Sequence, residues 1–217
     1  MLSLAAALVA CRGGDDDDDT TTPDAGGADD TSIYDIQDGT VGDGAIVTLR
    51  GVVVVAIDNY GNSRGSLWVA EPDEHATYGR AYSGVQVFTS DLSVVAGLAV
   101  GDLVDVVDAE VDEFTFADCA DPDVDCDDTL QTLTEVKLPA SIDKVGTAAV
   151  PAPVVVRPQD LAADPNEAEK WEGVLIRFDD VAVTQGPRDI GSDTTLKGIR
   201  VTGPFQVQSA LTDLGDV

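Results

Sequence analysis

The feature that most constrains the fold is a long run rich in β-branched residues, AIVTLRGVVVVAID, at positions 45–58. β-Branched side chains pack well on a pleated surface, and successive side chains of a strand point to opposite faces. One parity of the run is therefore expected to form a single face: Val47, Leu49, Gly51, Val53, Val55 and Ile57. The turn cluster NYGNSRG at 59–65 ends the run. The folded part of the chain thus opens with one long strand.

Four shorter runs with strand character follow, separated by turn signals, at 66–71, 84–89, 101–114 and 130–138. In the last two, the residues of one face are expected to be Val107, Ala109 and Val111, and Leu130, Thr132, Thr134, Val136 and Leu138. Residues 33–44 begin with a short helical turn, and residues 91–101 predict a short helix or turn between the third and fourth strands. This order is typical of an all-β, OB-type five-stranded barrel, expected over residues 33–140.

The second half begins with a stretch that contains several prolines, and runs with strand character follow it. Pro151, Pro153 and Pro158 exclude a long helix, so residues 141–168 predict a proline-containing linker with a short helix near 159–162. The run EKWEGVLIRFDDVAVTQ at 169–185 predicts a strand in which Val174, Ile176 and Phe178 share one face. Val181 and Val183 have the other parity, so a bulge is expected at 179–180. Further strands are expected at 195–203 and 205–209, and no clear fourth and fifth strands follow. Residues 169–217 therefore predict a second, incomplete OB-like β domain.

Several short motifs occur in a characteristic order: LRGVVVVAID, GSLWVAEPD, YSGVQVFT, VGDLVDVVDAEVDEF and LQTLTEV. In this order they resemble the OB-fold modules of bacterial secreted endonucleases and related surface proteins, and WEGVLIRF resembles the opening of a second module. The catalytic domain of those nucleases needs two histidines and several metal-binding acids. This chain has a single histidine, His75, in an expected loop. We therefore expect no enzyme, and an accessory nucleic-acid-binding module is one alternative that the resemblance implies.

The N-terminal sequence MLSLAAALVAC has an apolar core from Leu2 to Ala10. At about 1.5 Å per residue, such a helix cannot cross a hydrocarbon layer of about 30 Å, but the run fits the core of an export signal. Leu8-Val9-Ala10-Cys11 resembles the lipobox of bacterial lipoproteins. The resemblance implies a signal peptide at 1–10, a lipid bilayer as partner through acylated Cys11, and a cell-envelope location. Because Arg12 replaces the aspartate of inner-membrane retention signals, an outer-membrane lipoprotein is expected.

Residues 11–32 hold five consecutive aspartates but no aliphatic side chain larger than alanine, and they predict an acidic, disordered tether. The whole chain carries 41 acidic against 12 basic residues, a net charge of -29. The first 32 residues contribute only eight of these acids, so the folded part is also acidic. Affinity for nucleic acid depends mainly on lysine and arginine contacts with phosphates. Nucleic acid is therefore an improbable partner.

The segment DCADPDVDCDD at 118–128 combines two cysteines with regularly spaced acids. Cys119 and Cys126 are close enough in sequence for a disulfide that closes the loop between the fourth and fifth strands, worth roughly 2–3 kcal/mol. Asp121, Asp123 and Asp125 alternate as calcium ligands do, although the glycine and glutamate of an EF-hand loop are missing. No cofactor is expected apart from this possible calcium ion, and a calcium-dependent adhesion module is a second alternative function.

OB barrels usually bind ligands on the face of the second and third strands. On this chain that face is expected to hold aromatic and arginine residues, namely Tyr60, Arg64, Trp68, Arg80 and Tyr82, together with Tyr78 and Phe88. Such side chains can stack on a base or a sugar. The alternative is that Trp68 and Phe88 belong to the core and the tyrosines only cap loops. The sequence therefore predicts a membrane-anchored, exported lipoprotein that acts as a non-catalytic binding or scaffolding module for a protein or saccharide.

Overall fold

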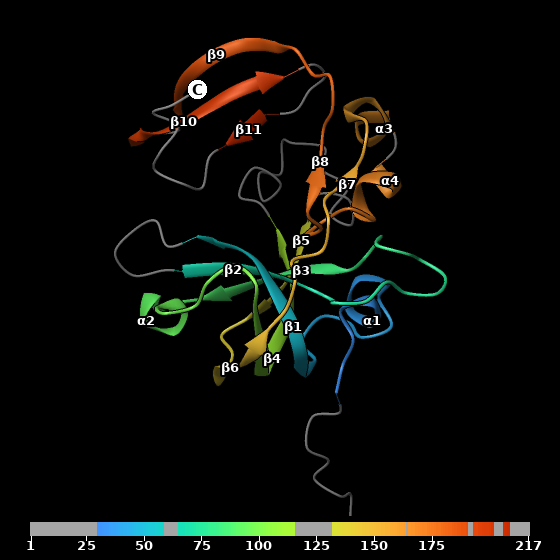
Figure 1. The fold of residues 1–217 in the computed structure, drawn as a ribbon, viewed down its shortest axis with the longest axis vertical. Coiled ribbons are helices and arrows are strands. Elements are labelled where there is room, and N and C mark those ends of the chain that lie inside the picture. Colours follow the sequence, from blue (N-terminus) through green and yellow to red (C-terminus); the bar gives the residue numbers. More distant parts are fainter. Residues whose placement is uncertain are drawn as a thin grey trace, which may run out of the picture.

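The computed structural model describes residues 30–58, 65–115, 132–163, 165–190, 193–201 and 206–208 (Figure 1). Two short helices and six strands form the first half: α1 Ile33–Gln37, β1 Ile46–Asp58, β2 Gly65–Ala70, β3 Gly84–Thr89, α2 Leu92–Val95, β4 Asp102–Thr115, β5 Thr132–Lys137 and β6 Ser141–Thr147. Within the described ranges, no helix is both long and apolar enough to span a membrane.

The first half is an OB-type barrel. The sheet has the strand order β1-β2-β3-β5-β4-β6, and an additional pairing of β1 with β4 closes five of these strands into a ring. The β3–β5 pair is parallel and the other pairs are antiparallel. The expected helical segment, α2, lies between β3 and β4. The predicted all-β class and OB-type barrel are confirmed.

The core of the barrel is built almost entirely from valine. The buried cluster lies inside the ring of strands and is completed by α1 and α2: Ile33, Ile36, Val47, Leu49, Val52, Val54, Leu67, Val69, Val85, Val87, Val95, Val104, Val106, Ala109, Val111 and Val136. β-Branched side chains suit this interior because they have few rotamers to lose and pack closely between neighbouring strands.

Two bulges change which residues face this core. Gly51 (φ 60°) and Asp108 (φ 50°) adopt left-handed backbone conformations where the β1–β4 register shifts. Each bulge inserts one residue and reverses the inward parity of its strand. The core therefore takes Val52 and Val54 from β1, so the predicted single face is wrong at Val53 and Val55. Ile57 packs against the core as predicted, because the β1–β2 register shifts again between Val54 and Ala56. In β4, likewise, Val106 rather than Val107 enters the core.

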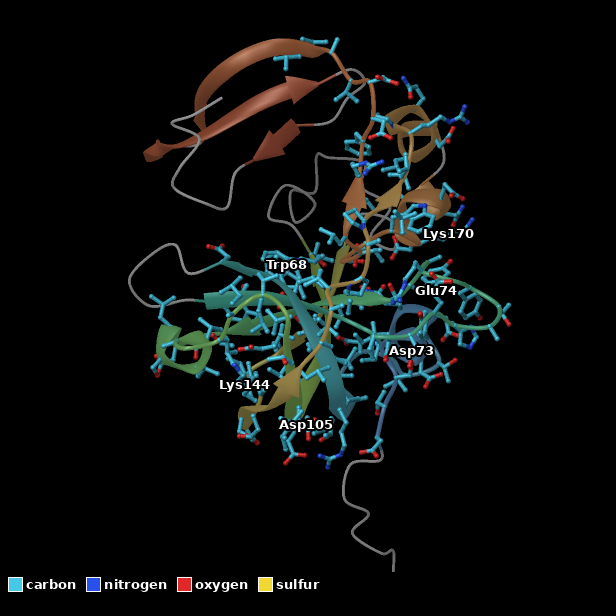
Figure 2. The ribbon with its side chains drawn as sticks, viewed as in Figure 1. Trp68, Asp73, Glu74, Asp105, Lys144 and Lys170 are labelled. Atoms are coloured by element: carbon cyan, nitrogen blue, oxygen red, sulfur yellow. The ribbon has the colours of Figure 1, made fainter. Side chains whose placement is uncertain are left out.

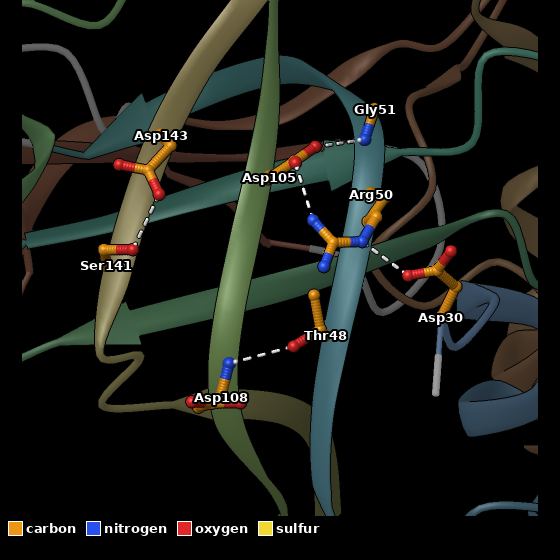
Figure 3. A network of polar contacts seen from close by, with 8 residues as sticks. All are labelled: Asp30, Thr48, Arg50, Gly51, Asp105, Asp108, Ser141 and Asp143. Atoms are coloured by element: carbon orange, nitrogen blue, oxygen red, sulfur yellow. Dashed lines mark hydrogen bonds and ion pairs between the residues drawn. The ribbon is translucent and has the colours of Figure 1, made fainter. Parts of the chain in front are cut away.

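Polar contacts fasten both bulges across the β1–β4 seam (Figure 3). The backbone N–H of Gly51 donates to Asp105 Oδ1 at 2.8 Å, and the Arg50 guanidinium lies between Asp105 and Asp30. At the second bulge, the N–H of Asp108 donates to the hydroxyl of Thr48 at 3.2 Å. These side chains replace ladder hydrogen bonds that the inserted residues interrupt.

The barrel sheet continues beyond its expected end. Residues 141–147, predicted as the start of the linker, form β6, which pairs with β4 from Asp102 to Val107. The signal for this strand was weak because three of its side chains in a row are exposed: Asp143, Lys144 and Val145. An edge strand with solvated side chains lacks the apolar alternation that identifies a half-buried strand.

The rest of the chain has short elements: β7 Val154–Val155, α3 Pro158–Ala163, α4 Pro165–Glu169, β8 Ile176–Arg177, β9 Val183–Ile190, β10 Asp193–Val201 and β11 Gln206–Gln208. The predicted strand at 169–185 is divided between β8, which pairs with β7, and β9, with Asp180 (φ 55°) in the break. Strands β9, β10 and β11 form an antiparallel sheet in the order β11-β10-β9. That these strands belong to a second OB-like module stays a prediction.

Residues 165–177, called the docked segment below, pack against the outer face of the barrel. Gly84 has the parity of the outward residues of β3, and a Cβ atom placed on it would lie 2.2 Å from the carbonyl oxygen of Gly173. Gly173 itself has a left-handed conformation, with φ 66°. The backbone N–H of Tyr82 donates to the carbonyl of Lys170 at 2.8 Å. The docked segment therefore covers the beginning of β3.

Candidate binding groove

The part of this outer face that the docked segment leaves open forms a groove of about 600 Å³. Its lining comes from all five strands of the barrel ring: Asp58, Gly65, Ser66, Gln86, Phe88, Asp112, Phe114, Leu133, Glu135 and Lys137. Gly65 and Asp58 border the loop between β1 and β2, while Phe114 and Leu133 border the loop between β4 and β5. The groove thus occupies the region where the sequence predicted a ligand face.

Strand register explains why these side chains gather. Trp68, Gln86, Glu135 and Asp112 are successive partners across β2, β3, β5 and β4. A second row of partners joins Ser66, Phe88, Lys137 and Glu110 in the same order. The residues between these rows, such as Val87 and Val136, are buried in the core. Strict alternation therefore sends the two rows to the outer face.

The walls of the groove combine apolar surface with a paired lysine. Phe88 and Leu133 are partly exposed, and Phe114 has 45% of its surface accessible. The Lys137 ammonium lies 2.6 Å from Asp112 Oδ1 and 3.4 Å from Glu110 Oε1. The hydrogen bond to Asp112 is the main cause that raises the pKa of Lys137. This cation is therefore already neutralised by two carboxylates of β4.

Glu135 is the unusual member of the groove. Only 5% of its surface is accessible, although it is one of the lining residues. Among the described residues, none donates a hydrogen bond to its carboxylate. Burial raises the pKa of Glu135 to about 7, and the charge of Asp112 adds to this effect while Lys137 opposes it. The groove thus contains a largely buried carboxylate whose oxygens accept no hydrogen bond from the described residues; in that part of the chain, the fully buried side-chain atom without a partner is Gln37 Oε1.

The structure brings only part of the predicted ligand face together. Phe88 lines the groove, and Trp68 lies beside it on β2, partly exposed (Figure 2). Both side chains project from the outer face, so the alternative that they belong to the core is wrong. Their strand neighbours Leu67 and Val87 are the ones in the core.

Arg80 and Tyr82 lie elsewhere, in the loop that joins β2 to β3. The Arg80 guanidinium donates to the carbonyls of Glu71 and Pro72 at 2.7 and 2.8 Å, so it fastens its own loop. Tyr82 has a left-handed backbone (φ 67°), and its ring meets that of Tyr78 edge to face. Neither residue lines the groove. In Figure 2, Asp73 and Glu74 of this loop lie apart from Trp68.

His75 also lies in that loop and has a local structural role. Its Nδ1 accepts the backbone N–H groups of Thr77 and Tyr78 at 3.2 and 3.3 Å. Its ring stacks on Tyr78 with centroids 4.8 Å apart and lies 4.9 Å from the Tyr34 ring. The other predicted site residues lie outside the described part of the chain: Cys11, Tyr60, Arg64, Cys119, Asp121, Asp123, Asp125 and Cys126.

A second carboxylate, which is half-buried and which sequence reasoning missed, holds the docked segment. Glu172 Oε1 accepts the backbone N–H of Thr134 at 2.6 Å, one residue before the β3–β5 ladder begins. Burial raises the pKa of Glu172 to about 7; the bond to Thr134 lowers it, and Glu169 and Glu113 raise it further. The sequence signal for this role is the motif WEG at 171–173, in which Glu172 precedes the glycine that contacts the backbone of Gly84. Its partner, 38 positions away, could not be read from the sequence.

Comparisons with known proteins add little to this geometry. No family model matches the chain, and no curated protein matches it. A chain assigned as an aspartyl-tRNA synthetase from Leishmania major Friedlin aligns over 65% of this protein with 13% identity and a TM-score of 0.39. This protein spans only 25% of the length of that chain. Pot1pC of Schizosaccharomyces pombe bound to single-stranded DNA aligns over 49% of this protein and 83% of its own chain, with 13% identity and a TM-score of 0.32.

Proposed function

We propose that this protein is an exported, membrane-anchored lipoprotein whose barrel binds a ligand in the open groove and catalyses no reaction. The observation that carries the binding role is the groove itself, which combines accessible aromatic surface with a few converging polar groups. Ligand sites in proteins generally have this composition. The ligand belongs to a partner protein or a saccharide, as the sequence indicated.

The groove favours binding over catalysis because its polar groups lack a nucleophile next to a base. Ser66, its one hydroxyl-bearing lining residue, accepts a hydrogen bond from Gln86 Nε2 at 3.2 Å. The chain's one histidine is held in the β2–β3 loop by backbone and ring contacts. Nucleophilic catalysis requires a base within hydrogen-bond reach of the nucleophile. In the described groove the Ser66 hydroxyl is bonded to the amide of Gln86, and Asp112 raises the pKa of Lys137 and so keeps its amine protonated.

The binding role is tested by ligand-observed NMR with the full chain and a mixture of monosaccharides, amino-acid amides and aliphatic amines. We expect at least one compound to bind, and Phe88→Ala to abolish the signal because it removes the aromatic wall. Val145→Ala, which alters an exposed apolar side chain on β6, is the matched control. Absence of any Phe88-dependent binder would contradict the proposed function.

The anchoring role depends on Cys11 and on the tether that follows it. Multiple acyl chains, each contributing about 0.8 kcal/mol per buried CH₂, would hold the protein stably at a membrane. We expect Cys11→Ala to move the protein from the membrane fraction to the soluble fraction and to prevent labelling with palmitate. Unchanged fractionation and labelling in this variant would exclude lipidation at Cys11.

A further inference from the structure

We propose that the groove binds a protonated amine on an apolar stem, such as the side chain of a lysine presented by a partner, with the Glu135 carboxylate as its counter-ion. This inference rests on the proposed binding role and assigns the chemical class of the ligand. It is carried by the burial of Glu135, by the state of the neighbouring charges and by the composition of the walls.

Glu135 stands apart from the other buried carboxylates of the described chain. Asp102 is 3% exposed, but it is bonded to Lys144 at 2.7 Å and to the N–H of Ala99 at 3.0 Å. The half-buried Glu172 is bonded to the backbone of Thr134. Among the described residues, none donates a hydrogen bond to Glu135. Because a largely buried carboxylate is poorly solvated, a cationic ligand that pairs with it recovers free energy that the free protein lacks.

The walls around Glu135 suit the stem of such a ligand. Phe88 is the strand partner of Lys137, two positions along β5 from Glu135, and Leu133 lies two positions in the other direction. Side chains two apart on a strand share one face, so apolar surface flanks the carboxylate on both sides. Methylene groups bury well against such surface, and an aromatic face attracts an ammonium group.

The charges of the groove disfavour anionic and neutral ligands. Its one lysine is engaged by Asp112 and Glu110, so it is not free to bind a phosphate or sulfate. The net charge of -29 on the whole chain attracts cations and repels polyanions. A sugar hydroxyl can donate to Glu135 but leaves its charge without compensation. An ammonium group both donates hydrogen bonds to Glu135 and compensates its charge.

The proposal predicts a dependence on pH. The charged groups that act on Glu135 are Asp112 from β4 and Lys137 from its own strand. Glu110 of β4 pairs with Lys137, Asp58 of β1 also lines the groove, and β3 contributes the uncharged Gln86 and Phe88. Because the pKa of Glu135 is about 7 in the empty groove, the carboxylate must lose a proton before it binds the amine. Affinity is therefore expected to fall as the pH decreases below about 7, by up to about tenfold per pH unit.

The test compares n-hexylammonium with 1-hexanol, which has the same stem without the charge. Binding to the full chain is measured by two-dimensional NMR at pH 8 and pH 5, following the backbone amides of Gln86 and Glu135. We expect hexylammonium to bind about tenfold or more tightly than hexanol at pH 8. Glu135→Gln is expected to abolish the difference, as is pH 5, whereas the matched control Glu172→Gln keeps it.

The other outcomes show whether the amine proposal alone fails or the proposed binding role fails with it. Equal affinity for hexylammonium and hexanol, or full hexylammonium affinity in Glu135→Gln, overturns the amine proposal but leaves an apolar binding groove. Binding of a monosaccharide in the groove without any binding of hexylammonium also overturns the amine proposal and favours a saccharide partner. Failure of every compound to bind overturns the amine proposal and the proposed function together.

Discussion

The outer face of the barrel has a covered part and an open part, and each contains a carboxylate with a pKa of about 7. In the covered part, the docked segment lies on the start of β3 and brings Glu172 to the backbone N–H of Thr134 at 2.6 Å. In the open part, Glu135 follows Thr134 directly in the chain and has no hydrogen-bond donor among the described residues. Glu172 thus contacts Thr134 of β5, while Glu135 is the next residue of the same strand, and the two carboxylates have different surroundings.

This difference separates a structural carboxylate from one that is available to a ligand. A buried acid that accepts a backbone N–H offsets part of its desolvation cost inside the folded chain. One without a donor retains that cost until something else supplies a positive charge or a hydrogen. The same chemistry therefore fastens two segments in one place and is the basis of the proposed binding site in the other.

The largest expected effect on stability comes from disrupting the contact between the docked segment and the start of β3. In Gly84→Ala, the added Cβ would lie 2.2 Å from the carbonyl oxygen of Gly173, so backbone must move. Overpacking of this kind costs roughly 3 kcal/mol, and the docked segment should become accessible to proteases. Gly42→Ala is the control, because nothing lies within 4 Å of its added atom. Urea denaturation and limited proteolysis measure both effects. Equal stability of the two variants would show that this contact does not hold the segment.

Smaller effects on stability are expected from substituting two neighbouring residues of β3, one in the core and one in the groove. Val87 is fully buried in the core and Phe88 lines the open groove. Val87→Ala should lower the free energy of unfolding by about 2 kcal/mol, since it removes buried methyl groups. Phe88→Ala should cost less than about 1 kcal/mol, despite removing a larger side chain, and should abolish ligand binding. Thermal unfolding and ligand-observed NMR measure the two results. A reversed order of stabilities would place Phe88 in the core.

A third expected effect on stability is its dependence on pH. A folded-state pKa raised from 4.5 to about 7 means that the native state holds its proton more tightly than the unfolded chain. The contribution of Glu172 and Glu135 to stability is therefore fully present below about pH 4.5 and is lost as the pH rises through 7. Urea denaturation at pH 5 and pH 8 should show this loss.

Substitution tests the assignment to Glu172. The amide oxygen of Glu172→Gln can still accept the N–H of Thr134, but the side chain cannot ionise. We expect this variant to be more stable than the original chain at pH 8, on the order of 1 kcal/mol, and equally stable at pH 4.5. Exposed Glu74→Gln should change neither value. A loss of stability at pH 8 would indicate that the charge of Glu172 is needed for docking.

Much of the fold was predictable from local patterns. The first five strands lie within two residues of their expected limits, and both short helices start within one residue of the expected position, but α2 ends at Val95, six residues before the end of the expected segment at 91–101. Long β-branched runs between turn clusters have few other arrangements in which to bury their side chains. The inward faces of β1 and β4 were predicted only in part, because bulges at Gly51 and Asp108 reverse their parity. No local pattern distinguishes a bulged glycine or aspartate from one in a regular strand.

The sequence by itself determined that the chain forms a valine-rich OB-type barrel with an acidic surface, since strand alternation and net charge are properties of neighbouring residues. It also predicted a ligand face on the second and third strands, but left open whether Trp68 and Phe88 belong to that face or to the core. Only the tertiary structure decided that Phe88 lines the groove, that Arg80 and Tyr82 lie outside it, that β6 extends the sheet, and that Glu172 docks on Thr134. The same is true of Glu135, a strand glutamate whose burial depends on side chains from three other strands. That no described residue donates a hydrogen bond to it is a property of that assembly, and it is one basis for the proposed amine site.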